Sequence, residues 1–186
     1  EAMKTNPLFH PLLVALACAI ILPWLMGVAG LTTTSATEVV IFALACMGLN
    51  LLAGYTGLVS FGHGAWFGLG AYIAALVALA LPGDAMVLPL LVAVLLTAGI
   101  ATGFGWLMLR RRGVYFSLMT LALSALGFTI AFRWTSVTGG ENGLGGIERP
   151  VLLGIDLNNN MSFYILVAVI ALLAAGLMWR FVNSPL

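Results

Sequence analysis

A long stretch without charged side chains limits what this chain can fold into. From Val39 to Gly83 the sequence contains no Lys, Arg, Asp or Glu. A soluble domain typically carries about 25% charged residues, whereas this chain is 62% hydrophobic and 7% charged. The stretch therefore predicts helices that lie in a lipid bilayer, and it excludes a soluble domain.

Glycines interrupt the middle of this uncharged stretch. The segment GYTGLVSFGHG contains Gly54, Gly57, Gly62 and Gly64, and glycine loosens a helix. A broken helix survives at membrane depth only where protein or a water-filled cavity satisfies the freed backbone groups. We therefore expect two membrane spans joined by a glycine-rich, partly polar break inside the bundle. This break is the candidate functional centre.

Six stretches are long enough to cross the hydrocarbon core, which takes roughly 20 helical residues. They predict an all-α membrane protein, a polytopic bundle of about six transmembrane helices forming one domain over residues 1–186. The predicted spans are Leu8–Leu31, Glu38–Ala53, Ser60–Leu81, Ala85–Leu109, Val114–Trp134 and Met161–Val182. Pro23 is expected to kink the first span, and the polar segment Thr32–Thr37 is expected to be a loop.

Basic residues predict the orientation of the bundle. If the N-terminus is cytoplasmic, most of them lie on the cytoplasmic side, as the positive-inside bias requires. These are Lys4, Arg110, Arg111, Arg112 and Arg180. Arg133 and Arg149 are the exceptions.

Small residues recur at spacings that favour close helix packing. Two GxxxG pairs are present, Gly64 with Gly68 and Gly99 with Gly103. In the fifth span four small residues recur at three- and four-residue steps, so they share one helix face. They are Ser117, Thr120, Ser124 and Gly127. This face either packs against a neighbouring helix or lines a route for a solute.

Nothing in the sequence predicts an enzyme, a cofactor or a metal site. A hydrolytic site needs a nucleophile with a base or a carboxylate pair, and the spans offer no carboxylate beyond Glu38 at a helix end. Cys18 and Cys46 lie inside apolar runs and are expected to be buried free thiols. The net charge of +1 is too small to indicate a nucleic-acid partner.

Polar residues in and beside the break are the candidate pathway residues. His63 is the only titratable side chain near the middle of the uncharged stretch, and it either relays protons or contacts a ligand, or it is a neutral structural residue. Asn50 either bonds across helices or faces a cavity. Tyr55, Thr56 and Ser60 either offer hydroxyls to a solute or satisfy the backbone groups that the break frees.

Apart from Glu38 at a helix end, the predicted spans lack the carboxylates that ion-coupled transport would use for energy coupling. Ion- or proton-coupled carriers usually hold ionisable groups inside the membrane. Uphill transport would therefore draw its energy from a partner, and because this chain has no P-loop, the partner would bring the nucleotide site.

The segment 135–160 is a long loop that mixes apolar and turn residues, so we expect it to fold against the outer face. Long structured loops are often functional. It serves either as a docking surface for a periplasmic partner, with Glu141, Asn142 and Glu148 as candidate contacts, or as a lid over the bundle.

Three segments carry a resemblance to a known family. GYTGLVSFGHGAWFGLGAY with Asn50 upstream, LRRRGVYFSLMTLAL at Leu109–Leu123 and WTSVTGGENGLGGI at Trp134–Ile147 resemble the branched-chain amino acid permeases of ATP-binding-cassette importers, LivM type. Together they cover about half of the chain. Urea and short-amide importers share much of this pattern, which leaves the substrate open.

The resemblance implies a multi-pass subunit of a bacterial inner membrane, surrounded by membrane lipid. It also implies a second homologous permease subunit, two cytoplasmic ATPase subunits and a periplasmic solute-binding protein. Family members continue beyond the NSPL at Asn183–Leu186 into a cytoplasmic loop and further helices, so we expect this sequence to be the N-terminal portion of a longer fold. A passive channel for a small neutral solute such as urea and a purely structural subunit are the competing hypotheses.

Overall fold

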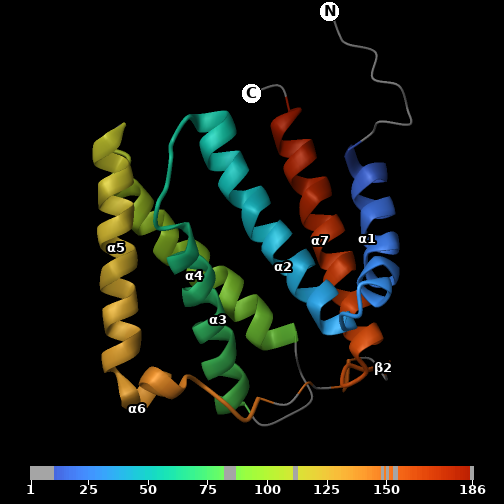
Figure 1. Cartoon of the computed structure of the whole chain (residues 1–186). Coiled ribbons are helices and arrows are strands. Elements are labelled where there is room, and N and C mark those ends of the chain that lie inside the picture. Colours follow the sequence, from blue (N-terminus) through green and yellow to red (C-terminus); the bar gives the residue numbers. More distant parts are fainter. Residues whose placement is uncertain are drawn as a thin grey trace, which may run out of the picture. The chain divides into compact units, whose positions relative to one another are not determined.

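The computed structural model describes residues 11–81, 87–110, 113–147, 149, 151–152 and 155–184, and it is almost entirely helical (Figure 1). The chain divides into two compact units. One comprises Glu1–Gly48 and Leu157–Leu186, and the other comprises Leu49–Asp156. Each unit is described by itself.

The all-α membrane class is confirmed. Five helices in the described part of the chain are long and apolar enough to cross a membrane: Thr33–Tyr55, His63–Ala80, Val87–Met108, Val114–Arg133 and Asn160–Val182. The first predicted span corresponds to α1 (Pro11–Val28), whose described apolar part, Leu12–Val28, is shorter than these five. Residues 8–10 of that span and the predicted turn at 82–84 lie outside the described residues.

Helix α2 (Thr33–Asn50) begins five residues before the predicted start at Glu38. The segment Thr32–Thr37 had been expected to be a loop because it is polar. Instead, the Thr32 hydroxyl accepts a hydrogen bond from the Ser35 amide at 3.4 Å, the arrangement of a helix N-cap. The Thr37 hydroxyl donates to the Thr33 carbonyl at 3.0 Å. Hydroxyls that bond to their own helix remove the cost of their polarity.

The first unit packs α1 and α2 with α7 (Asn160–Val182). Its buried cluster joins two residues of α2 to two of α7: Ala36, Val40, Tyr164 and Ala168. Small side chains at these positions let the helix backbones approach closely, which is how membrane helices gain packing contacts. The Asn159 side chain caps α7 by accepting a hydrogen bond from the Met161 amide at 3.0 Å.

Pro23 leaves a carbonyl of α1 without its helical donor. Proline has no N–H, so the Ala19 carbonyl, four residues earlier, lacks the bond that a helix would normally give it. The Tyr164 hydroxyl of α7 donates to this carbonyl. The residue that interrupts α1 thereby creates the acceptor that joins α1 to α7.

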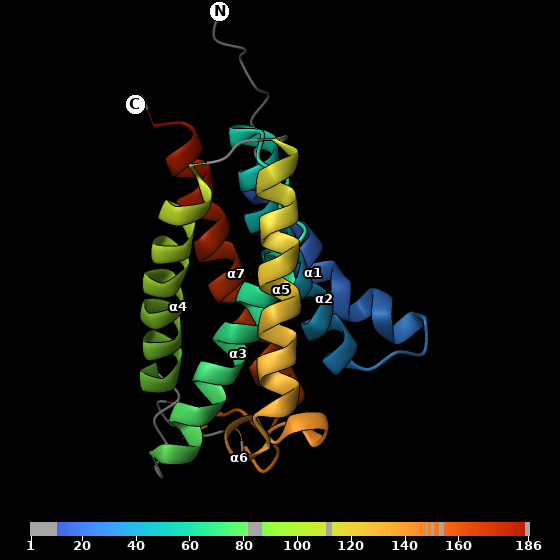
Figure 2. The same cartoon turned by 90° about the vertical axis from the view of Figure 1, so that its left-hand side faces the viewer.

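The second unit contains α3 (His63–Ala80), α4 (Val87–Met108) and α5 (Val114–Arg133), with α3 contacting both others (Figure 2). Trp66 and Phe104 meet edge to face between α3 and α4, with ring centroids 6.0 Å apart. A Cβ added to Gly70 would lie 3.5 Å from the Thr97 hydroxyl. The α3–α4 contact is therefore formed by an aromatic pair and a glycine.

Short elements follow α5. They are α6 (Thr135–Thr138), the 3-10 turn η3 (Gly140–Asn142), and the two-residue antiparallel strands β1 (Val151–Leu152) and β2 (Ile155–Asp156). The described residues of the predicted loop 135–160 therefore include several short helical and extended elements.

Replacing Tyr164 with Phe should destabilise the first unit by roughly 1 kcal/mol, because the Ala19 carbonyl loses its donor in a low-dielectric environment. The measurement is equilibrium unfolding of the purified full-length protein in bicelles. The matched control is Tyr115→Phe, since the Tyr115 side chain is 72% exposed.

A double-mutant cycle makes this test specific. Pro23→Ala restores the N–H that can bond to the Ala19 carbonyl, so Tyr164→Phe should cost less in that background. An equal cost in both backgrounds would show that the hydroxyl does not compensate for Pro23.

Candidate translocation site at the helix break

The predicted break lies between a widened helical turn and α3. The π-helical turn η2 (Leu51–Tyr55) follows α2 directly, and residues 57–62 are not helical. Gly57 has a φ of +68°, a left-handed conformation that favours glycine. The Thr56 hydroxyl and the Leu58 amide both donate to the Leu52 carbonyl. These bonds end the helix, and α3 begins again at His63.

The break packs against α5 through hydrogen bonds between its backbone and side-chain hydroxyls of α5. The Ser117 hydroxyl donates to the Val59 carbonyl at 2.6 Å, and the Thr120 hydroxyl accepts from the Phe61 amide at 3.1 Å. Thr120 in turn donates its hydroxyl hydrogen to the Ser117 carbonyl at 2.8 Å. Two backbone groups that the break removes from helical bonding therefore find partners on one face of α5.

Gly62 allows this close approach. A Cβ at this position would lie 2.0 Å from the Thr120 carbonyl oxygen and 2.7 Å from its carbon. No side chain fits there unless the backbone of α5 or of the break moves. The same Cβ would lie 3.4 Å from the Ser124 Cβ, so the serine–threonine face of α5 contacts the break over two turns.

The contact between the break (residues 57–62) and α5, here called the junction, lies near the first residue of α5. Ser117 and Thr120 are three and six residues after Val114, which places them roughly 5 and 9 Å along the helix axis at 1.5 Å per residue. Ser60, Ser117 and Thr120 are buried there. A polar backbone segment therefore lies inside an apolar unit. The three buried side chains beside it each carry a hydroxyl group and no charge.

The other predicted pathway residues lie away from this junction or at its margin. Asn50, Tyr55 and Thr56 are exposed in the isolated chain. The Asn50 amide oxygen lies beside Gly54, 3.2 Å from where a Cβ on that glycine would be. His63 and Ser124 are half-buried. Of these residues, only Tyr55 lies within the widened turn Leu51–Tyr55. A role of all these residues in a pathway stays a prediction.

Hydrogen bonding bears on the two interpretations of the α5 face. The hydroxyls of Ser117 and Thr120 form hydrogen bonds with the break and with their own helix. These bonds favour packing as the role of the two residues. Sequence reasoning identified this face and the break separately. It missed Gly62 as the point where they meet, although a glycine directly before α3 was the available signal.

The two GxxxG pairs lie at open positions of α3 and α4. A Cβ added to Gly64, Gly68, Gly99 or Gly103 would meet no described atom within 4 Å. Packing through these glycines stays a prediction, and it would involve helices other than those described around them.

Beyond α5, Thr138 fixes the start of the long loop. Its buried hydroxyl donates toward the Ala131 and Trp134 carbonyls and accepts from the Gly140 amide. Gly139 and Gly140 both have positive φ, and a Cβ on Gly139 would lie 2.1 Å from the Gly143 oxygen. This folded turn exposes Glu141 and Asn142, while Glu148 lies outside the described residues.

Gly62→Ala should destabilise the protein by about 1–3 kcal/mol, since the added methyl group forces backbone shifts in a packed contact. Gly64→Ala, two residues later on open helix, is the matched control, and alanine there favours the helix. Thermal unfolding of the purified full-length protein measures both. Equal stability of the two variants would contradict the close contact with Thr120.

Comparison with known proteins assigns the chain to a protein family. Residues 31–186 match the family described as branched-chain amino acid transport system / permease component. The chain is 33% identical over 126 residues to the high-affinity branched-chain amino acid transport system permease protein LivM of Salmonella typhimurium. It is 32% identical over 152 residues to the protein of the same name from Escherichia coli. No solved structure matches the chain significantly.

The two alignments cover 67% and 81% of this chain, but only 29% and 34% of the relatives. The resemblance carried by GYTGLVSFGHG and the two later segments is thereby confirmed. The helices are those of a multi-pass membrane protein. The chain belongs to the family of branched-chain amino acid transport permeases.

Proposed function

We propose that this chain is part of the inner-membrane permease subunit of an ATP-driven importer. The importer translocates branched-chain or other small apolar amino acids delivered by a periplasmic solute-binding protein. Both relatives are named for high-affinity branched-chain amino acid transport, which supports this substrate class.

The main support for this proposal is the helix break packed against α5. A non-helical backbone segment inside an apolar helical unit is costly, and discontinuous helices of this kind form substrate sites in many transporters. Residues 57–62 adopt this conformation against Ser117 and Thr120. In this proposal, Ser60, His63 and Ser124 line the solute route beside the docked segment.

The energy source is proposed to lie on partner subunits. The uncharged run from Val39 to Gly83 contains no carboxylate for ion coupling, and the sequence has no phosphate-binding P-loop. Two cytoplasmic ATPase subunits and a second homologous permease would complete the importer. ATP hydrolysis takes place on those subunits and not on this chain.

The N-terminus is proposed to be cytoplasmic, because Arg110, Arg180 and Lys4 then lie inside. The turn held by Thr138 then faces the periplasm. Its exposed Glu141 and Asn142 are proposed to contact the binding protein.

Reconstituted transport tests the function. Proteoliposomes containing the full-length permease, its partner permease and the ATPase subunits should accumulate leucine only with ATP inside and the loaded binding protein outside. The control replaces the ATPase with a hydrolysis-deficient variant. Urea uptake by the permease alone, without ATP, would instead identify a passive channel.

Thiol labelling tests the route. In a background without Cys18 and Cys46, Ser124→Cys should react with a small hydrophilic thiol reagent, and transported leucine should slow this reaction. Val94 lies in α4 and is 61% exposed. Val94→Cys should react much more slowly, because lipid excludes the charged reagent. Equal labelling rates at the two positions would exclude a water-accessible route beside Ser124.

A further inference from the structure

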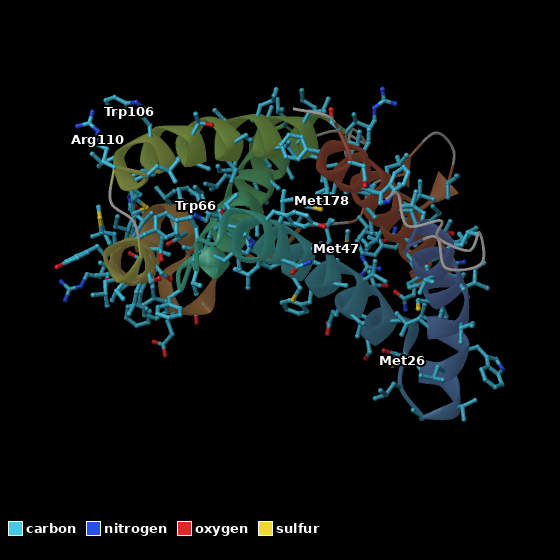
Figure 3. All side chains as sticks on the ribbon, turned by 90° about the horizontal axis from the view of Figure 1, so that it is seen from above. Met26, Met47, Trp66, Trp106, Arg110 and Met178 are labelled. Carbon is cyan, nitrogen blue, oxygen red and sulfur yellow. The ribbon has the colours of Figure 1, made fainter. Side chains whose placement is uncertain are left out.

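A cationic side chain lies over an aromatic ring where α4 ends. The Arg110 guanidinium carbon lies 4.2 Å from the ring centroid of Trp106, within the distance of a cation–π interaction. Helix α4 ends at Met108. Figure 3 shows the two labelled side chains together at the outer side of this end.

The aromatic ring supplies no oxygen acceptor to the guanidinium. Its N–H groups point outward in the plane of the group, where they can bind an oxygen anion with two parallel hydrogen bonds. Among the described residues, Arg110 makes no hydrogen bond or ion pair that would use these donors. Arg110 is thus held by Trp106 while its donors are available to a ligand.

The surface along α4 from Trp106 is apolar and open. Leu95 and Trp106 are 70% and 68% exposed, and their separation of eleven positions corresponds to about three helical turns. Gly99 lies between them on the same face, and a Cβ there would meet no described atom within 4 Å. A ligand with an anionic group at the level of Arg110 and a hydrocarbon chain along α4 matches both features.

We propose that Trp106 and Arg110 form a binding site for the phosphate group of an anionic phospholipid. Tryptophan and arginine at the end of an apolar span lie at headgroup depth, and arginine binds phosphate through two hydrogen bonds. The acyl chain lies along the face that contains Leu95 and Gly99. This assignment requires only that α4 spans the membrane, so it is independent of the transported substrate.

Lipid retention tests the site. The purified full-length permease is equilibrated with micelles containing equal amounts of phosphatidylglycerol and phosphatidylcholine, and bound lipids are counted by native mass spectrometry. Arg110→Ala should lower phosphatidylglycerol retention about fivefold, the effect expected for one basic residue near an anionic lipid surface. Phosphatidylcholine retention should not change.

Three variants make the result specific. Arg133→Ala, at the last residue of α5, removes the same charge at another span end and should leave phosphatidylglycerol retention unchanged. Trp106→Leu removes the aromatic ring and should lower retention. Arg110→Lys keeps the charge without the planar donors and should also lower retention, and thermal unfolding verifies that each variant is folded.

Equal retention by Arg110→Ala and the unaltered protein would overturn the proposal. Displacement of phosphatidylglycerol by added inorganic phosphate would also overturn it, because the site would then bind free phosphate. Unchanged lipid binding with loss of co-purifying ATPase subunits would assign Arg110 to a protein interface instead.

Discussion

Every backbone N–H and C=O inside a membrane needs a hydrogen-bond partner from the protein, and the helix break satisfies this requirement at one junction. The break exposes the Val59 carbonyl and the Phe61 amide, and α5 supplies Ser117 and Thr120 to bind them. Gly62 lets the two backbones come close enough for these bonds to form. The position of α3 relative to α5 follows from this contact.

The same requirement is met by hydroxyl groups elsewhere in the chain. Thr37, Thr102 and Thr129 each donate to the carbonyl four residues earlier in their own helices. Thr138 binds the carbonyls at the end of α5, and Tyr164 binds the carbonyl that Pro23 leaves free. Hydroxyls can satisfy carbonyls without introducing a charge into hydrocarbon, which is far more costly.

Much of the fold could be predicted from the sequence, because length, hydropathy and glycine content are local properties. The helix ends at Met108 and Val182 and the break after Tyr55 lie close to where these properties predict them. The start of α2 at Thr33 was missed, because polarity alone does not reveal that a threonine bonds to its own helix.

The candidate site was predicted in parts. The break and the hydroxyl face of α5 were each identified from spacing, but their pairing joins residues almost sixty positions apart, and no local pattern encodes that. Asn50, Tyr55 and Thr56 were expected at the centre because they flank the glycines. In the structure all three are exposed, and the chain forms a π-helical turn at Leu51–Tyr55, which helical periodicity does not predict.

The bond between Tyr164 and Ala19 spans 145 positions of the sequence. A ribosome makes α1 first and α7 much later, so the Ala19 carbonyl enters the bilayer before its donor has been synthesised. Until then water, lipid headgroups or the insertion machinery must solvate that carbonyl. The Ala19 carbonyl therefore gains this donor only after α7 has been made, so the order of synthesis is part of how α1 reaches its final contacts.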